Sequence, residues 1–144
     1  MVSDNVNNGY LGFRYDADGT VWLKVNYKND GVAKTPMQVI LDETGYVALD
    51  LADAAKYYYV GVPAKTFATG VDGWIQVGGL VEDMITPSLS MSVGHAFTIH
   101  DGAVSDAGAD YSGASNEFGC AVTATTTSTT QDAMLIPRII LATT

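Results

Sequence analysis

The sequence is poor in cysteine and in basic residues, and both scarcities exclude classes of structure or partner. Cys120 is the only cysteine among 144 residues, so no intramolecular disulfide can form. A single cysteine is consistent with synthesis in a reducing compartment. The chain carries 7 Lys and Arg against 16 Asp and Glu, a net charge of −9. Nucleic acids and anionic membranes attract clustered basic side chains, so neither is expected as a partner.

Long apolar runs are also missing. No segment approaches the roughly 20 apolar residues that cross a bilayer as a helix. The Asn-rich start, residues 1–8, has neither the basic nor the apolar stretch of a secretory signal. We therefore expect a soluble chain. Its hydrophobic fraction of 47% is enough for a core, because a domain of about 150 residues buries roughly 68–70% of its unfolded surface.

Short β-strands separated by glycine-containing turns are predicted for most of the chain. The strand-like runs of the second half are residues 57–62, 74–77, 96–100, 118–123 and 134–141. Turns are expected at residues 70–73, at Gly78-Gly79 and at Asp101-Gly102, and a long loop at residues 105–116. This spacing of short strands and turns predicts an all-β fold, a small β-barrel or sandwich.

The first half of the domain shows the same pattern. Residues 21–27 alternate, with Val, Leu, Val and Tyr on one face and Trp22, Lys24 and Asn on the other, as in a half-buried strand. We expect a hairpin turn at residues 29–31 and a second hairpin formed by residues 37–41 and 46–51.

Three further segments are less regular. Asp50 is placed to cap a short helical turn at residues 51–56. Residues 80–85 fit either a short helix or a strand. The Thr-rich segment 123–130 favours a strand followed by a loop.

The N-terminal segment, residues 1–15, is predicted to be an extended arm outside a single β-rich domain of residues 16–144. Tyr10, Phe13 and Tyr15 place three aromatic rings within six positions. A frayed terminus is one interpretation. We favour an arm that becomes ordered on a partner, with its aromatics as anchors and its backbone as an added strand.

No catalytic or metal-binding set is recognisable. The Asp16-x-Asp18-Gly19 segment opens like a calcium loop, but Tyr27 stands where the bidentate Glu should be, so we interpret it as a turn. His95 and His100 are five residues apart and should face opposite sides of a strand. We predict no catalytic residue, no metal and no cofactor. An enzyme that uses Cys120 with these histidines is the third hypothesis.

The aromatic residues of the second half admit two interpretations. Along a strand, Tyr57 and Tyr59 share one face and Tyr58 takes the other. Simple aromatic packing explains such rings, with one of them at the rim of the core. The alternative is a contact surface that includes Tyr58 and Trp74, for another subunit or for sugar rings.

A group of segments in the C-terminal two-thirds carries a resemblance to a known family. These segments are residues 59–62, 92–104, 118–122 and 133–138. Their order is a Gly-x-Ala strand, an Asp-Gly turn, a loop, a Phe-Gly-x-Ala strand and a closing apolar strand. This order resembles the small β-barrel decoration, or cement, proteins of tailed-bacteriophage capsids. The first 50 residues have no counterpart in this comparison.

The resemblance implies a β-tulip-like domain with short helical turns and an extended arm. It also implies a homotrimer on the outside of the virion that clamps neighbouring subunits of the major capsid protein, after synthesis in the host cytoplasm. The partner-binding residues expected from the arm and the exposed aromatics are Asn5, Asn8, Tyr10, Phe13, Tyr15, Tyr58 and Trp74. The alternative hypothesis is a carbohydrate-binding or adhesive β-module.

Overall fold

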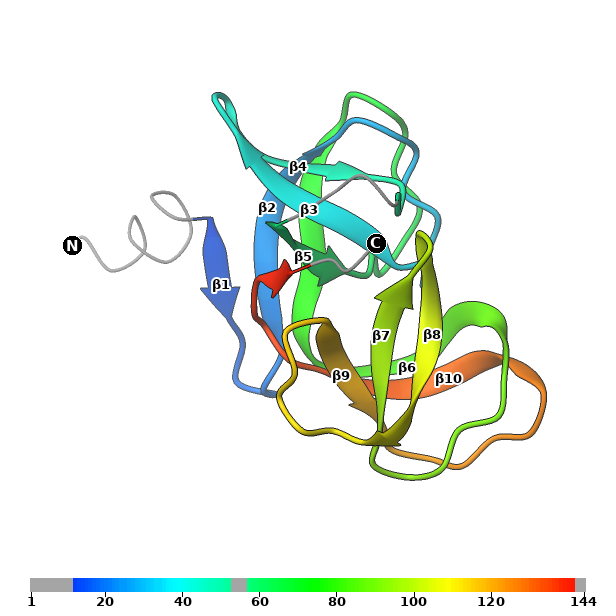
Figure 1. The fold of residues 1–144 in the computed structure, drawn as a ribbon. Helices are drawn as coiled ribbons and strands as arrows, with labels where there is room; N and C mark the ends of the chain where they lie inside the picture. Colours follow the sequence, from blue (N-terminus) through cyan, green and yellow to red (C-terminus); the bar gives the residue numbers. More distant parts are fainter. Residues whose placement is uncertain (1–11, 53–56, 142–144) are drawn as a thin grey trace.

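The structure, a computed structural model, describes residues 12–52 and 57–141. Within these residues every regular element is a strand, which confirms the all-β prediction (Figure 1). The strands are β1 Phe13–Tyr15, β2 Val21–Tyr27, β3 Met37–Asp42, β4 Gly45–Leu49, β5 Tyr57–Gly61, β6 Asp72–Leu89, β7 His95–His100, β8 Ala103–Asp110, β9 Glu117–Ala121, β10 Ser128–Leu135 and β11 Ile140–Leu141. The predicted helical turn is absent at Leu51 and Ala52, and the remainder of it lies outside the described residues.

The strands form one continuous sheet in the order β11-β5-β3-β4-β2-β6-β10-β9-β7-β8, and β1 adds to β2. All pairs are antiparallel except β2 with β4. The two ends of this order, β11 and β8, do not pair with each other, so the sheet is not closed into a barrel. It folds over itself in a sandwich-like arrangement (Figure 1).

The long strand β6 connects the two halves of the molecule. Its first part pairs with β2 and its second part with β10. Gly78 and Gly79, where a turn was predicted, lie inside this strand and mark the change of partner. At Gly79 the backbone has φ +89°, and a Cβ atom would lie 2.8 Å from the carbonyl oxygen of Gly19. The glycine therefore permits a bend in β6 without ending it.

Two buried clusters form the core, one on each side of this bend. The first contains Leu23, Tyr27 and Ile75 and packs β2, β3, β4 and β6 together. The second contains Met84 and Phe97 and packs strands of the C-terminal half with β5. Each fully buried Leu, Ile, Phe or Met side chain contributes about 1.5–3 kcal/mol relative to exposure. The core is thus divided between two clusters that share β6.

The first half follows the predicted strands but not every predicted connection. The side chains of β2 alternate between buried and exposed as expected, and β3 and β4 form the predicted hairpin. Residues 29–31 were predicted as a hairpin turn, but β2 does not pair with β3, because β4 lies between them. Gly31 instead exchanges two backbone hydrogen bonds of 2.8 Å with Phe67. Because of this long-range pairing, the segment between β2 and β3 does not form a tight turn.

The second half contains more strand than predicted. β7 and β8 meet at Asp101-Gly102, where both residues have positive φ (51° and 72°), as in the predicted tight turn. β8 occupies much of the predicted loop, and only residues 111–116 remain irregular. The predicted order in the Thr-rich segment is wrong, because a loop at residues 122–127 precedes β10. Pro137 lies between β10 and β11, where one strand was expected.

The loop of residues 111–116 is held by a buried carboxylate. Glu117, 5% exposed, accepts backbone hydrogen bonds from Ser112 (2.9 Å), Gly113 (2.9 Å) and Ala114 (3.2 Å). Burial alone would raise the pKa of Glu117, but these donors stabilise the carboxylate and lower its pKa below the ordinary value. Arg138 donates to the carbonyl oxygens of Gly113 and Ala114 at 3.0 and 3.1 Å. The loop is therefore fixed from both sides.

Candidate functional site

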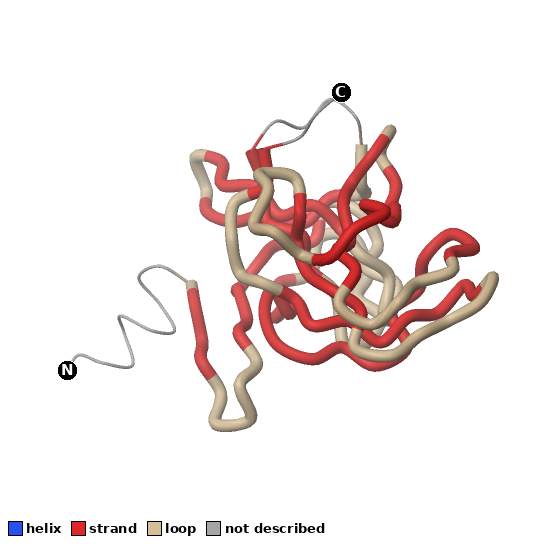
Figure 2. The backbone as a smooth tube through the Cα atoms, turned by 60° about the horizontal axis from the view of Figure 1, so that its bottom comes forward, coloured by secondary structure: helices blue, strands red, loops and turns tan. Residues whose placement is uncertain are grey.

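The β1–β2 hairpin brings the start of the described chain onto the sheet. Its turn closes through hydrogen bonds between Asp16 and Thr20 (3.0 Å) and from the Gly19 amide to Asp16 (3.1 Å). The Asp16-x-Asp18-Gly19 segment is thus a turn, as interpreted from the sequence. Phe13–Tyr15 pair with β2, so the predicted boundary between arm and domain at residue 15 falls inside this hairpin. The hairpin lies at the margin of the molecule (Figure 2).

An aromatic group forms on one face of the hairpin, and we call Phe13, Tyr15, Tyr46 and Tyr59 the tyrosine cluster. The Phe13 ring meets Tyr46 and Tyr59 edge to face, with centroids 6.2 and 5.7 Å apart. Tyr15 stacks on Phe13 at 6.2 Å and remains 65% exposed. The cluster therefore has a half-buried base on the first core and an exposed ring at its edge.

The phenols of Tyr46 and Tyr59 are held neutral. Burial raises the pKa of Tyr46, and burial together with the neighbouring Tyr46 and Tyr15 hydroxyls raises the pKa of Tyr59. Neutral phenols both donate and accept hydrogen bonds. The cluster can therefore offer an apolar ring surface and polar hydroxyls to a neighbouring chain.

The structure places the three consecutive tyrosines in three different environments. Tyr57 is 67% exposed and Tyr59 belongs to the tyrosine cluster. Tyr58 was predicted to contact a partner, but it is 1% exposed and packs in the second core. Its strand β5 pairs with β11, which sets Ile140, a member of the same core cluster, opposite Tyr58. This burial contradicts a contact role for Tyr58 in the folded chain, and Tyr57 has the exposed ring.

The opposite face of the sheet carries both tryptophans of the chain, Trp22 on β2 and Trp74 on β6. Arg14 alternates with Phe13 and Tyr15, so its side chain lies on this second face. Its guanidinium carbon is 5.2 Å from the Trp22 ring centroid and 4.6 Å from that of Trp74. The Arg14 Nε also pairs with the Asp16 carboxylate at 2.9 Å. Arg14 thereby holds β1 against the outer side of β2 and β6.

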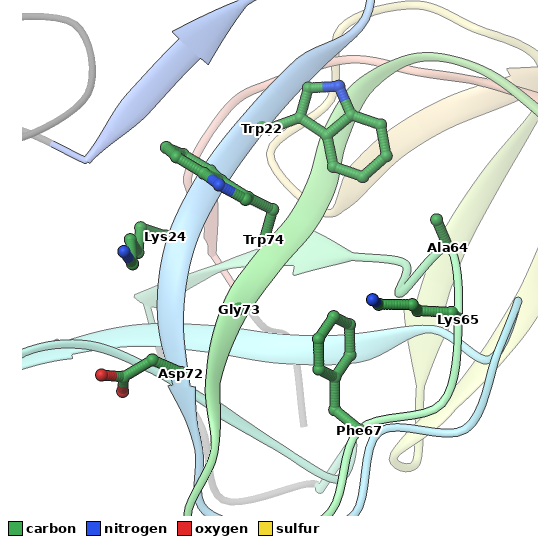
Figure 3. A pocket seen from close by; sticks show the side chains of 8 residues that line it. All are labelled: Trp22, Lys24, Ala64, Lys65, Phe67, Asp72, Gly73 and Trp74. Carbon is green, nitrogen blue, oxygen red and sulfur yellow. The ribbon is translucent and has the colours of Figure 1, made fainter.

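A pocket of about 620 Å³ opens beside these tryptophans. It lies between the two indoles and the segment that carries Phe67 (Figure 3). A Cβ atom on Gly73 would lie 2.5 Å from the Phe67 ring, so glycine allows that ring to pack on the β6 backbone. We call this site the tryptophan pocket, and its lining residues are Trp22, Lys24, Ala64, Lys65, Phe67, Asp72, Gly73 and Trp74.

The tryptophan pocket has an excess of positive charge. Lys24 lies 5.9 Å from the Trp74 ring centroid, and Lys65 lies 5.4 Å from that of Phe67. Neither lysine forms an ion pair with a residue of the described chain. Asp72 accepts a hydrogen bond of 2.8 Å from Asn26. The pocket therefore combines flat rings, one carboxylate and two lysines that have no ion-pair partner among the described residues.

The two histidines considered for catalysis each lie beside an aspartate. His95 lies 3.4 Å from Asp106, and His100 lies 3.3 Å from Asp101. Burial raises the pKa of Cys120 and so favours its neutral thiol over the nucleophilic thiolate. Across residues 12–52 and 57–141, no group of three or more His, Cys, Asp or Glu is arranged to hold a metal ion. No helix in that part of the chain is long and apolar enough to cross a membrane.

The predicted site residues thus separate into several groups. Asn5, Asn8 and Tyr10 lie outside the described residues. Phe13 and Tyr15 come together in the tyrosine cluster, whereas Trp74 lines the pocket on the other face of the same sheet.

Sequence reasoning missed Trp22, Lys24, Lys65 and Phe67 as members of this pocket. The alternation of residues 21–27 already placed Trp22 and Lys24 on the outer face of a strand. An outward tryptophan next to an outward lysine was the signal available for that part of the site. Lys65 and Phe67 lie in an irregular segment, and only the folding of the chain brings them to the same pocket as the two tryptophans.

Comparison with known proteins shows a similarity of fold. No protein-family description matches the chain, and no curated protein matches it. Among solved structures, the chain is similar to the N base of the head fiber protein gp8.5 of bacteriophage phi29. The TM-score is 0.51 at 17% sequence identity, and the alignment covers 83% of this chain and 96% of that one. The two chains therefore share a fold across nearly the whole of the phi29 domain.

Proposed function

We propose that this chain is a structural protein of a bacteriophage virion that binds the outer surface of the assembled capsid. The observation that supports this most strongly is the fold shared with the N base of a phage head fiber. The sequence motifs that resemble those of capsid decoration proteins support the same proposal independently of the fold. In this proposal the protein clamps neighbouring subunits of the major capsid protein and carries out no chemical reaction.

The β1–β2 hairpin supplies the attachment surface in this proposal. Among the described strands, β1 pairs only with β2, so its other edge can accept a further strand. Tyr15 places an exposed ring beside that edge. A neighbouring chain can thus gain backbone hydrogen bonds and bury an aromatic anchor at one place.

Trimerisation would strengthen a modest contact of this kind. Three linked copies bind a lattice with an avidity that can exceed a single contact by about 10²–10⁴. A clamp that binds only the assembled shell stabilises the shell by mass action. The net charge of −9 favours solubility of the free protein before it attaches.

Occupancy of phage heads by a Tyr15→Ser variant tests the proposed attachment surface. Tyr57→Ser is a matched control, because Tyr57 is 67% exposed and Tyr15 is 65% exposed. Heads that lack the protein are mixed with each variant, and the bound protein is quantified and imaged by electron cryo-microscopy. We expect Tyr15→Ser to reduce occupancy at least tenfold, while Tyr57→Ser leaves it unchanged.

Absence of density for this chain from the capsid exterior would rule out the proposal. Equal occupancy by both variants would leave the head assignment in place but remove the hairpin as its contact surface. Light scattering on the free protein tests the trimer, for which we expect three times the chain mass of 15.2 kDa.

A carbohydrate-binding module is the second candidate function. The sequence suggested this function through the consecutive tyrosines, Trp74 and the Thr-rich segment. The observation in its favour is the tryptophan pocket, which contains Trp74 but none of those tyrosines. Because the two faces of the β1–β2 sheet are separate surfaces, one protein can use one face for attachment and the other for a ligand.

A further inference from the structure

The tryptophan pocket contains aromatic rings on a sheet face where polar side chains are expected. Trp22 and Trp74 lie on neighbouring strands and point away from the core, next to Lys24 and Asp72 (Figure 3). Contact with Arg14 accounts for part of this arrangement, but Arg14 does not line the pocket. We propose that the pocket binds a saccharide that carries an anionic group, a carboxylate or a phosphate.

The shape and lining of the pocket favour a saccharide. Its volume of about 620 Å³ lies within the roughly 300–1,000 Å³ of typical small-ligand sites. A pyranose ring has a flat C–H face that packs on an indole and a rim of hydroxyl groups that need hydrogen-bond partners. Asp72 accepts one bond from Asn26 and keeps acceptor capacity for such hydroxyls.

The charge of the pocket favours an anion. Lys24 and Lys65, which both line the pocket, are two of the 7 basic residues of a chain whose net charge is −9. Of the nearby acids, Asp16 pairs with Arg14, whereas Asp72 keeps its charge and accepts a hydrogen bond from Asn26. The pocket lining therefore carries two positive charges against one negative charge. A carboxylate or phosphate on the sugar would therefore meet Lys24 and Lys65 without a competing ion pair from the described chain.

The same features disfavour three other ligand classes. A quaternary ammonium group also binds aromatic rings, but Lys24 and Lys65 would repel it. A long nucleic acid would meet the repulsion of a chain with 16 acidic residues, beyond the few phosphates that this pocket can contact. An acidic peptide satisfies the lysines but has no ring to stack on the tryptophans.

Tryptophan fluorescence reports this pocket selectively, because both tryptophans of the chain line it. The full-length protein is first applied to an array of uronic acid, sialic acid and phosphorylated glycans with their neutral counterparts. The acidic glycan with the strongest signal is then titrated in solution while the fluorescence is recorded. We expect a saturable change and a Kd that weakens with added salt.

Three variants test the named residues, and a fourth variant serves as a control. We expect Trp74→Ala to weaken binding at least about tenfold, and Lys24→Glu and Lys65→Glu to weaken it similarly by reversing charge. For these variants a tritium-labelled or spin-labelled glycan replaces fluorescence as the readout. Lys28→Glu makes the same charge change on an exposed lysine outside the pocket and should leave the Kd unchanged.

Each remaining outcome overturns the inference. If no acidic glycan binds above background, the pocket is not a saccharide site. If the neutral counterparts bind equally well, the anionic group is not required. If a polyglutamate peptide binds equally well, the ligand need not be a saccharide. The charge-reversal variants keep the test valid if Trp74→Ala fails to fold. The measurement uses free protein without heads, so its failure is distinguishable from a failure of the proposed capsid attachment.

Discussion

Glu117 shows how a single side chain stabilises an irregular segment of this protein. A carboxylate at 5% exposure would be unfavourable without partners. Three backbone amides and the Ser112 hydroxyl surround it and lower its pKa. The carboxylate thereby substitutes for the strand pairing that the loop of residues 111–116 lacks.

Replacement of Glu117 by Gln should destabilise the fold in a pH-dependent manner. At neutral pH we expect a loss of about 1–3 kcal/mol in the free energy of unfolding, because the amide leaves buried donors without an anionic acceptor. The pKa of Glu117 is lower in the folded state than its ordinary value of 4.5. The stabilisation is therefore complete above that value and is lost as the pH falls through the folded-state pKa.

Urea unfolding of wild type and E117Q across an acid series measures this effect. The difference between the two proteins should shrink as the pH falls below about 4.5. The exposed Glu82→Gln provides a control that should remain close to wild type throughout. A wild-type advantage that stays constant with pH would argue against the stated role of the charge.

The β1 strand joins two surfaces that are separate on the sheet. Phe13 packs into the tyrosine cluster on one face, and Arg14 covers the tryptophans on the other. The hairpin is therefore part of the folded domain and also the start of the proposed attachment surface. Two truncations separate these roles.

A chain that starts at Leu11 should keep its stability, because β1 and its contacts remain. A chain that starts at Thr20 loses the Phe13 ring and the Arg14 contacts, and we expect its free energy of unfolding to fall by more than about 2 kcal/mol. Thermal and urea unfolding measure both. Equal stability of the two truncations would mean that β1 contributes nothing to the fold.

The whole molecule has two core clusters that share one strand. Ile75 lies in the first cluster and Met84 in the second, both at 0% exposure, and both belong to β6. The sheet is also continuous from β11 to β8. A continuous sheet with a shared strand favours unfolding of both halves as one cooperative unit.

Ile75→Ala and Met84→Ala test this coupling from opposite sides of the β6 bend. Each is expected to lower the free energy of unfolding by about 2–5 kcal/mol. Tryptophan fluorescence reports the half with Trp22 and Trp74, whereas circular dichroism reports all strands. For each variant the two transitions should coincide. Separate midpoints in Met84→Ala would instead show that the halves unfold independently.

The amino-acid order alone was sufficient for the all-β class, the alternation of β2 and the tight turns at residues 16–19 and 101–102. These features depend on short-range preferences, namely two-residue periodicity and residues that tolerate positive φ. Long-range pairing determined the rest. It continued β6 through Gly78 and Gly79 without ending the strand, placed β4 between β2 and β3, and buried Tyr58 beside Ile140. The tryptophan pocket also required tertiary structure, because Phe67 and Trp22 come to line one pocket only through pairings distant in sequence.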